Sequence, residues 1–154
     1  MKALIFKLIL PLAVISFATI SKWWYAIPVD APDSLLIGFP FPYVCEGWHT
    51  SMSLQFFVLE LILDFLLYFA VWVAIVYCID RFLMKISLHK TLTMALWATA
   101  GIVVCCACLR LSFADPHWHA KRNFEMEILK TGYQFGLDWP ERPVFIKPNK
   151  NETQ

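Results

Sequence analysis

The chain has 154 residues, of which 59% are hydrophobic and only 16% are charged, and its mean hydropathy is +0.58. Soluble domains carry about 25% charged residues, so the composition excludes an ordinary water-soluble core and indicates a membrane protein. The net charge of +1 offers no basic surface for the phosphates of nucleic acid. The lipid bilayer is therefore the first partner that we expect.

The first apolar run covers residues 3–21 and is interrupted near its start by Lys7. A cleaved signal peptide has a shorter apolar core, of about 7–15 residues, and ends in a small-residue cleavage site. The run therefore predicts an uncleaved first transmembrane helix, with a signal peptide as the alternative. Pro11 removes a backbone donor and predicts a kink in this helix. Lys22 and the aromatic residues that follow it are typical of a membrane interface.

Residues 22–53 form a connection that is rich in proline and in aromatic residues. Proline and glycine interrupt it too often for a helix, but it is too apolar for a disordered linker. A long ordered loop inside a compact chain is frequently functional. We therefore predict a compact Pro-rich loop that lies on the outer face of the membrane.

Residues 54–79 form the longest apolar run. As a helix it would measure roughly 39 Å at ~1.5 Å per residue, against a hydrocarbon core of about 30 Å. Glu60 and Asp64 interrupt it four residues apart, which places both carboxyl groups on one helical face. Acids inside a membrane are costly and need a reason.

Two interpretations of these acids are open. In the structural one, Glu60 pairs with Arg110 of the next span, and a protonated Asp64 donates to a backbone carbonyl. In the other, Asp64 carries a proton or an ion. We prefer the structural interpretation, because ion-coupled proteins place more polar side chains along the path than Tyr68 and Thr99 provide.

A basic loop over residues 80–90 leads to the third predicted span, residues 91–113. Small residues recur along this span every three to four positions, and such a stripe lets helix backbones approach closely in lipid. In the second span Ala70 and Ala74 offer a complementary notch. The stripe consists of Thr91, Ala95, Ala98, Gly101, Cys105, Cys108 and Ser112.

Residues 114–154 form a mixed, soluble-looking tail. Asp115 and Pro116 are typical of a helix start and Gly132 of a helix stop, which predicts an amphipathic helix over about 116–131, followed by an extended segment. Together the elements predict an all-α membrane protein with three transmembrane helices in a membrane domain of residues 1–113. The basic residues of the N-terminus and of the loop 80–90 predict a cytoplasmic N-terminus and an outer tail.

Cysteine and histidine residues gather on the predicted outer side. Cys45 and the cysteines at the end of the third span suggest a role in disulfide transfer. Enzymes of that kind use a C-x-x-C pair, which is absent from this sequence. The alternative is that these small, weakly polar side chains pack between helices. His49, His117 and His119 suit zinc or copper. An H-x-H pair on a helix points its side chains about 200° apart, which is poor for joint ligation. We expect no cofactor.

The segment G-F-P-F-P-Y at residues 38–43, followed by L-I-L-D at residues 61–64 and by Tyr68, resembles small bacterial inner-membrane proteins with a G-F-P-rich loop before an L-I-L-D span. The resemblance covers residues 36–70. It implies a multi-pass protein of the bacterial cytoplasmic membrane, and it implies no activity.

The leading functional hypothesis is an accessory or assembly subunit of a larger membrane complex, or a homo-oligomeric scaffold, without chemistry of its own. Its partners would be other integral membrane proteins or further copies of the chain. One alternative is an ion- or proton-coupled membrane element centred on Asp64. The other is an outer-face protein that carries out thiol redox chemistry or binds a metal.

Overall fold

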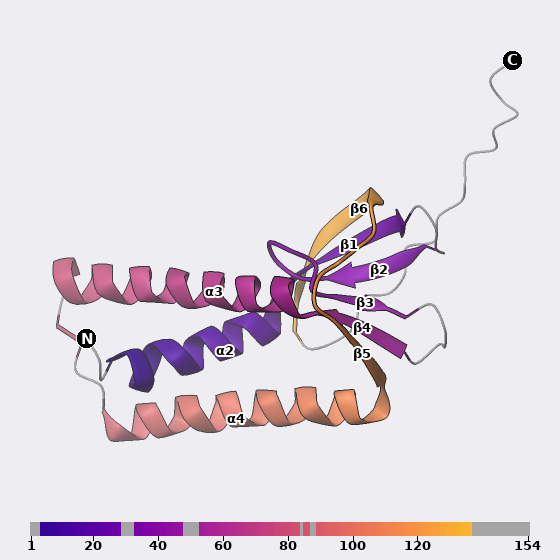
Figure 1. Cartoon of the computed structure of the whole chain (residues 1–154). Coiled ribbons are helices and arrows are strands. Elements are labelled where there is room, and N and C mark those ends of the chain that lie inside the picture. The colour runs from indigo at the N-terminus through magenta and orange to yellow at the C-terminus, as the bar shows by residue number, and fades with distance from the viewer. Residues whose placement is uncertain (1–3, 29–32, 48–52, 84, 87–88, 137–154) are drawn as a thin grey trace, which may run out of the picture.

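The computed structural model describes residues 4–28, 33–47, 53–83, 85–86 and 89–136. Apolar helices lie side by side at one end of the molecule, and a β-sheet lies at the other end (Figure 1). The helical elements are a π-helical turn η1 (Ile5–Ile9), α2 (Leu10–Thr19), α3 (Val58–Cys78), a second π-helical turn η2 (Ile79–Leu83) and α4 (Lys90–Phe113).

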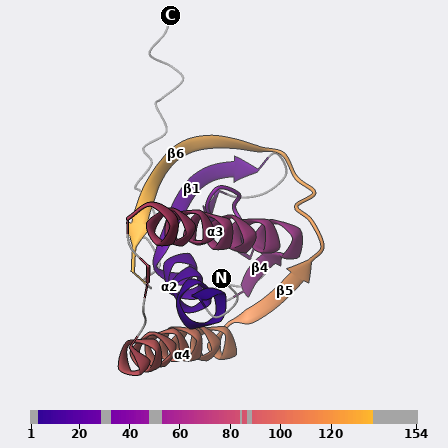
Figure 2. The same ribbon diagram turned by 90° about the vertical axis from the view of Figure 1, so that its left-hand side faces the viewer.

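The short helix α2 packs against both α3 and α4 and lies between them (Figures 1 and 2). Aromatic side chains of the two longer helices donate hydrogen bonds to residues 6–20. Such bonds stabilise helix packing inside a bilayer, because a donor there has no water molecule to bind. The bonds run from Trp72 Nε1 to Ser16 Oγ (2.8 Å), from the Tyr68 hydroxyl to the Ile20 carbonyl (2.6 Å) and from Trp97 Nε1 to the Phe6 carbonyl (3.2 Å).

The sheet has six strands in the order β5-β4-β3-β2-β1-β6. Only β4 and β5 are parallel, and every other neighbouring pair is antiparallel. Figure 2 shows the strands in an arc around the ends of α2 and α3, with the connection from β5 to β6 running along one side. The strands are β1 (Ile20–Pro28), β2 (Ser34–Ile37), β3 (Val44–Glu46), β4 (Ser53–Phe57), β5 (Asp115–His119) and β6 (Met126–Phe135).

Both faces of the central strands are covered, so all four residues of β2 are buried. A strand that is covered on both sides reads as a continuous apolar run, and S-L-L-I fits this. One core cluster consists of Ala26, Leu36, Cys45 and Phe57, with Phe124 from the β5–β6 connection packed against it. The other consists of Ile37, Val44 and Phe56, with Leu111 of α4 packed against it.

The predicted all-α fold is wrong, because the chain forms a mixed α/β structure with a six-stranded sheet. The predicted Pro-rich loop over 22–53 contains β2, β3 and most of β1. The predicted helix over 116–131 is replaced by β5 and the first part of β6. Among the described residues, Pro28 and Pro116 lie in strands, and Gly38, Pro40 and Pro42 lie in the turn between β2 and β3.

Gly132 shows why the tail was misread. It lies in the middle of β6, opposite Trp23 of β1, and a Cβ atom at this position would lie 2.5 Å from Cζ2 of the Trp23 ring. Only glycine leaves enough space at this position for the indole ring of Trp23 on the neighbouring strand. Pro116, read as a helix start, lies in the edge strand β5, where a missing backbone donor is tolerated.

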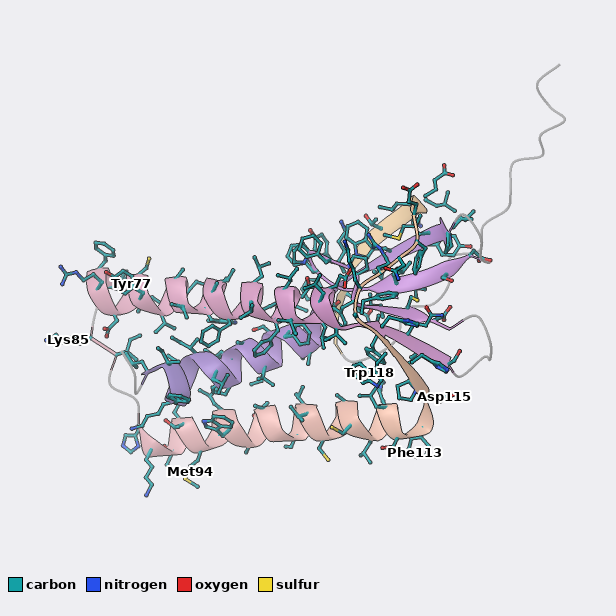
Figure 3. The ribbon with its side chains drawn as sticks, in the orientation of Figure 1. Tyr77, Lys85, Met94, Phe113, Asp115 and Trp118 are labelled. Carbon is teal, nitrogen blue, oxygen red and sulfur yellow. The ribbon has the colours of Figure 1, made fainter. Side chains whose placement is uncertain are left out.

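Two helical segments, Val58–Leu83 and Lys90–Phe113, are long and apolar enough to cross a membrane. The second of these agrees with the predicted span 91–113, whereas the first begins four residues later than the predicted span 54–79, because residues 54–57 belong to strand β4, and it continues to Leu83. The first predicted span, 3–21, corresponds to a shorter apolar helix, Ile5–Thr19, because the chain enters β1 at Ile20. Many large apolar side chains of the two long helices point outward (Figure 3).

We expect Gly132→Ala to destabilise the folded chain by about 1–3 kcal/mol, the usual cost of overpacking. The added methyl group would force the Trp23 ring out of its place between β1 and β6. Thermal unfolding in mild detergent measures this change. The control is Gly101→Ala in α4, where an added Cβ has no atom within 4 Å and alanine favours the helix. Equal melting temperatures for the two variants would contradict the packing argument.

Candidate functional site

Two buried carboxyl groups mark the place where α3 leaves the sheet. Asp64 is fully buried and Glu60 is 9% exposed, and the two lie one helical turn apart on α3. One oxygen of each is hydrogen-bonded: Asp64 Oδ1 accepts from the Phe41 N–H at 3.0 Å, and Glu60 Oε1 from the Arg122 N–H at 3.3 Å. Their second oxygens are buried without a hydrogen-bond partner among the residues that the structure describes.

The hydrogen bond from the Phe41 N–H to Asp64 connects the turn between β2 and β3 to helix α3. The turn starts at Gly38, whose φ of +154° suits glycine and where a Cβ would collide with the Phe41 carbonyl oxygen. The Trp24 indole donates to the Gly38 carbonyl at 3.0 Å, which fixes the start of the turn. The Tyr43 N–H donates to the Ile37 carbonyl at 3.0 Å, which closes it. The backbone N–H of Phe41 is thereby held toward Asp64.

Aromatic rings surround this turn. Tyr43 stacks on Phe17 of α2 with 5.2 Å between ring centroids, and Phe17 meets the ring of Tyr68 edge-on at 5.7 Å. Burial raises the pKa of the Tyr43 phenol above its ordinary range, and the nearby carboxylate of Asp64 adds to this. The Tyr43 hydroxyl is therefore a neutral group next to the buried acid.

Glu60 binds a second segment, the connection between β5 and β6, by accepting a hydrogen bond from the Arg122 N–H. Beside this bond, the Leu59 N–H donates to the Ala120 carbonyl at 3.1 Å. The ring of Phe124 then meets Phe57 edge-on at 5.8 Å. The first turns of α3 thus hold two separate parts of the sheet, one through each acid.

Arg110, the predicted partner of Glu60, lies exposed near the C-terminal end of α4. The hydrogen bond found at Glu60 comes from the backbone of Arg122, so the Glu60–Arg110 pair stays a prediction. Neither partner of the two acids was predictable from the sequence, because both are backbone N–H groups that leave no side-chain signature. The tight G-F-P-F-P turn was the one signal that pointed to them.

The small-residue stripe of α4 faces outward. The side of α4 that is buried in the molecule carries Ala100 and Val103, and a Cβ added at Gly101 would have nothing within 4 Å. Ala70 and Ala74 of α3 are exposed as well, so stripe and notch do not cover each other within the chain. The exposed stripe residues are Thr91, Ala95, Ala98, Gly101, Cys105, Cys108 and Ser112.

All five cysteines are free thiols, and the structure does not bring them together as one redox group. Cys45 is buried in the sheet, with its Sγ 3.8 Å from Oε1 of Gln55. Burial raises the pKa of this thiol to about 12, and the neighbouring Glu46 carboxylate adds to the shift. Since the thiolate is the reactive form, Cys45 is poorly suited to disulfide exchange. Cys105 and Cys108 are exposed on α4.

His117 and His119 lie in β5 rather than in a helix, so their side chains share one face of a strand. Both are exposed, and His49 lies outside the described residues. Within the described part of the chain, no three His, Cys, Asp or Glu side chains lie close enough to hold a metal ion. The described residues therefore provide no ligand cluster that would support the metal hypothesis.

Comparison of the chain with protein-family models, with curated proteins and with solved structures gives no match. The role of the two buried acids must therefore be inferred from the residues around them. They accept backbone hydrogen bonds from the β2–β3 turn and from the β5–β6 connection, and this arrangement fixes the sheet onto the helices.

We expect Asp64→Asn to fold nearly as well as the unmodified chain, because an amide oxygen still accepts the Phe41 N–H. Asp64→Leu removes the acceptor and leaves the part-buried Phe41 N–H unpaired, at a cost of about 1–3 kcal/mol. Melting temperatures in detergent should follow this order. If asparagine proves as damaging as leucine, the negative charge itself is needed and the anchoring role is wrong.

Proposed function

We propose that this protein is an accessory or assembly subunit of a larger membrane complex, or a homo-oligomeric membrane scaffold, with no chemistry of its own. The observation that carries the proposal is the outward face of α4. This helix packs one side against α2 and presents its small-residue stripe on an uncovered side.

The stripe is informative because lipid supplies no hydrophobic force that would drive helices together. A helix surface that meets only acyl chains can carry large apolar side chains at every position. Small residues at helical spacing instead allow the close approach of another helix, which van der Waals packing then stabilises. An exposed stripe along α4 is therefore the surface expected of a helix that packs against a protein partner.

The arrangement relative to the membrane belongs to the same proposal. The two long apolar helices span the bilayer, and the sheet lies at one surface. Lys7, Arg81, Lys85 and Lys90 belong to the ends of the helices away from the sheet (Figure 1). The sheet end also carries basic residues, among them Lys22, Lys121 and Arg122. We base the orientation on the short basic loop between the two long helices, and the positive-inside rule then makes that end cytoplasmic and the sheet outside. The resemblance of residues 36–70 supports the bacterial inner membrane as the compartment.

We expect Gly101→Leu to disrupt this association without unfolding the chain, since nothing surrounds the position within the monomer. A tagged protein purified from native membranes in mild detergent should carry a stoichiometric partner, or itself as an oligomer, and Gly101→Leu should lose it. The control is Val104→Leu, an exposed position of the same helix outside the stripe. If the unmodified chain purifies as a monomer, the subunit proposal is wrong.

Cys105 and Cys108 distinguish the two forms of the proposal. Both lie in the exposed stripe, so a short bifunctional thiol reagent added to membranes should link them across a self-association interface. A cross-linked dimer of the chain indicates the homo-oligomer. A cross-linked product of another mass, together with the co-purified partner, indicates the accessory subunit.

A second candidate function, the ion- or proton-coupled element centred on Asp64, is favoured by one observation. Asp64 Oδ2 and Glu60 Oε2 are both buried without a hydrogen-bond partner among the described residues, which leaves acceptors available to a proton or a cation. In vesicles containing the purified protein and a pH-sensitive dye, a proton leak that is lost in Asp64→Asn would support it. Identical leak rates for both proteins would contradict it.

A further inference from the structure

A groove lies where the helices meet the sheet. Its volume is about 160 Å³. The residues that line it come from four parts of the chain: the start of β1, the β2–β3 turn, the middle of α3 and strand β6. Most of its walls are aromatic or aliphatic. The residues that define it are Ile20, Phe39, Leu67, Tyr68, Val71 and Tyr133.

The side chains that line the groove favour a hydrocarbon ligand over a polar one. The Tyr68 hydroxyl is turned to the Ile20 carbonyl and the Trp72 indole N–H to Ser16, so these donors are already used. Ser21 contributes one hydroxyl oxygen, which is buried and has no hydrogen-bond partner among the described residues, so the walls hold a single unused polar atom of this kind. An apolar cavity of about 150 Å³ stays dry and binds a molecule the size of benzene. The groove therefore fits a short length of hydrocarbon and offers little to a polar ligand.

The position of the groove identifies the source of the hydrocarbon. Leu67 and Val71 form part of its wall and are 40% and 48% exposed, on the same outward surface of α3 as Leu63. This surface belongs to a helix long and apolar enough to cross a membrane. Tyr133 at the sheet end is exposed, as is typical of aromatic residues at the headgroup level. The groove is thus continuous with a surface that faces acyl chains.

We infer that this groove binds one acyl chain of a membrane lipid, with the chain between α3 and β6 and the headgroup near the sheet. The apolar walls favour hydrocarbon over water, and a peptide segment would leave its backbone groups unpaired there. The inference requires the long helices to lie in a bilayer. It does not require a partner subunit, because the groove and the stripe involve different helices.

The test uses the full chain in dioleoylphosphatidylcholine vesicles that contain a small fraction of a phosphatidylcholine with a photoreactive diazirine in its acyl chain. After illumination, mass spectrometry locates the adducts. We expect several-fold more adducts on Val71 and Phe39 than on Val104 of α4, which has the same exposed fraction as Val71, 48%. Equal labelling of the groove and of Val104 would mean ordinary contact with surrounding lipid and would overturn the inference.

Filled-groove variants sharpen the result. Val71→Trp and Leu67→Phe add bulk to the wall and should abolish the excess of adducts on Phe39, whereas Val104→Trp should leave it unchanged. Persistence of the excess in a folded filled-groove variant also overturns the inference. If neither variant folds, the distribution of adducts on the unmodified chain decides. Gly101→Leu should keep the groove adducts, so a failure of the subunit proposal does not change this outcome.

Discussion

The hydrogen bond from the Phe41 N–H to Asp64 is the constraint on which the relation between sheet and helices depends. Removing a carboxyl group from water is costly unless it is hydrogen-bonded. Here the acid is fully buried and its partner is a backbone group at the tip of a tight turn. Moving the turn away from α3 would break this hydrogen bond and leave the Asp64 oxygen buried without it. The turn therefore stays on the helix, and β2 and β3 stay with it.

A second constraint concerns the first helix. Ile5–Thr19 would measure about 22 Å at ~1.5 Å per residue, shorter than a hydrocarbon core of about 30 Å. The chain then continues directly into β1, so the sheet determines where this helix ends. Hydrogen bonds from Tyr68, Trp72 and Trp97 hold it between the two longer helices. A short apolar helix is thus stabilised by its neighbours rather than by its own length.

The sequence was sufficient for the two long helices, because length and apolarity are local properties that can be read from one segment. It was not sufficient for the sheet, because β1 pairs with β6 across a separation of about a hundred residues, and no local pattern reveals such a pairing. Gly132 was read as a helix stop when it makes room for the Trp23 ring. Asp64 and Glu60 were correctly placed on one helical face. Their partners were missed, since a backbone N–H is present at nearly every position and marks none.

The two long helices have similar apolarity but different exposed surfaces, and this difference bears on function. The outward side of α3 carries mainly large side chains, such as Ile62, Leu66 and Leu67, with Ala70, Ala74 and Cys78 as its small residues. Along α4 a small residue recurs every three to four positions from Thr91 to Ser112, beside exposed large side chains such as Met94 and Ile102. Crossing a bilayer requires apolar residues but no particular size, so insertion alone does not explain the contrast. Large side chains suit contact with lipid, and small ones suit close helix packing. The contrast supports a lipid neighbour for α3 and a protein neighbour for α4, which is the arrangement that the two proposals describe together.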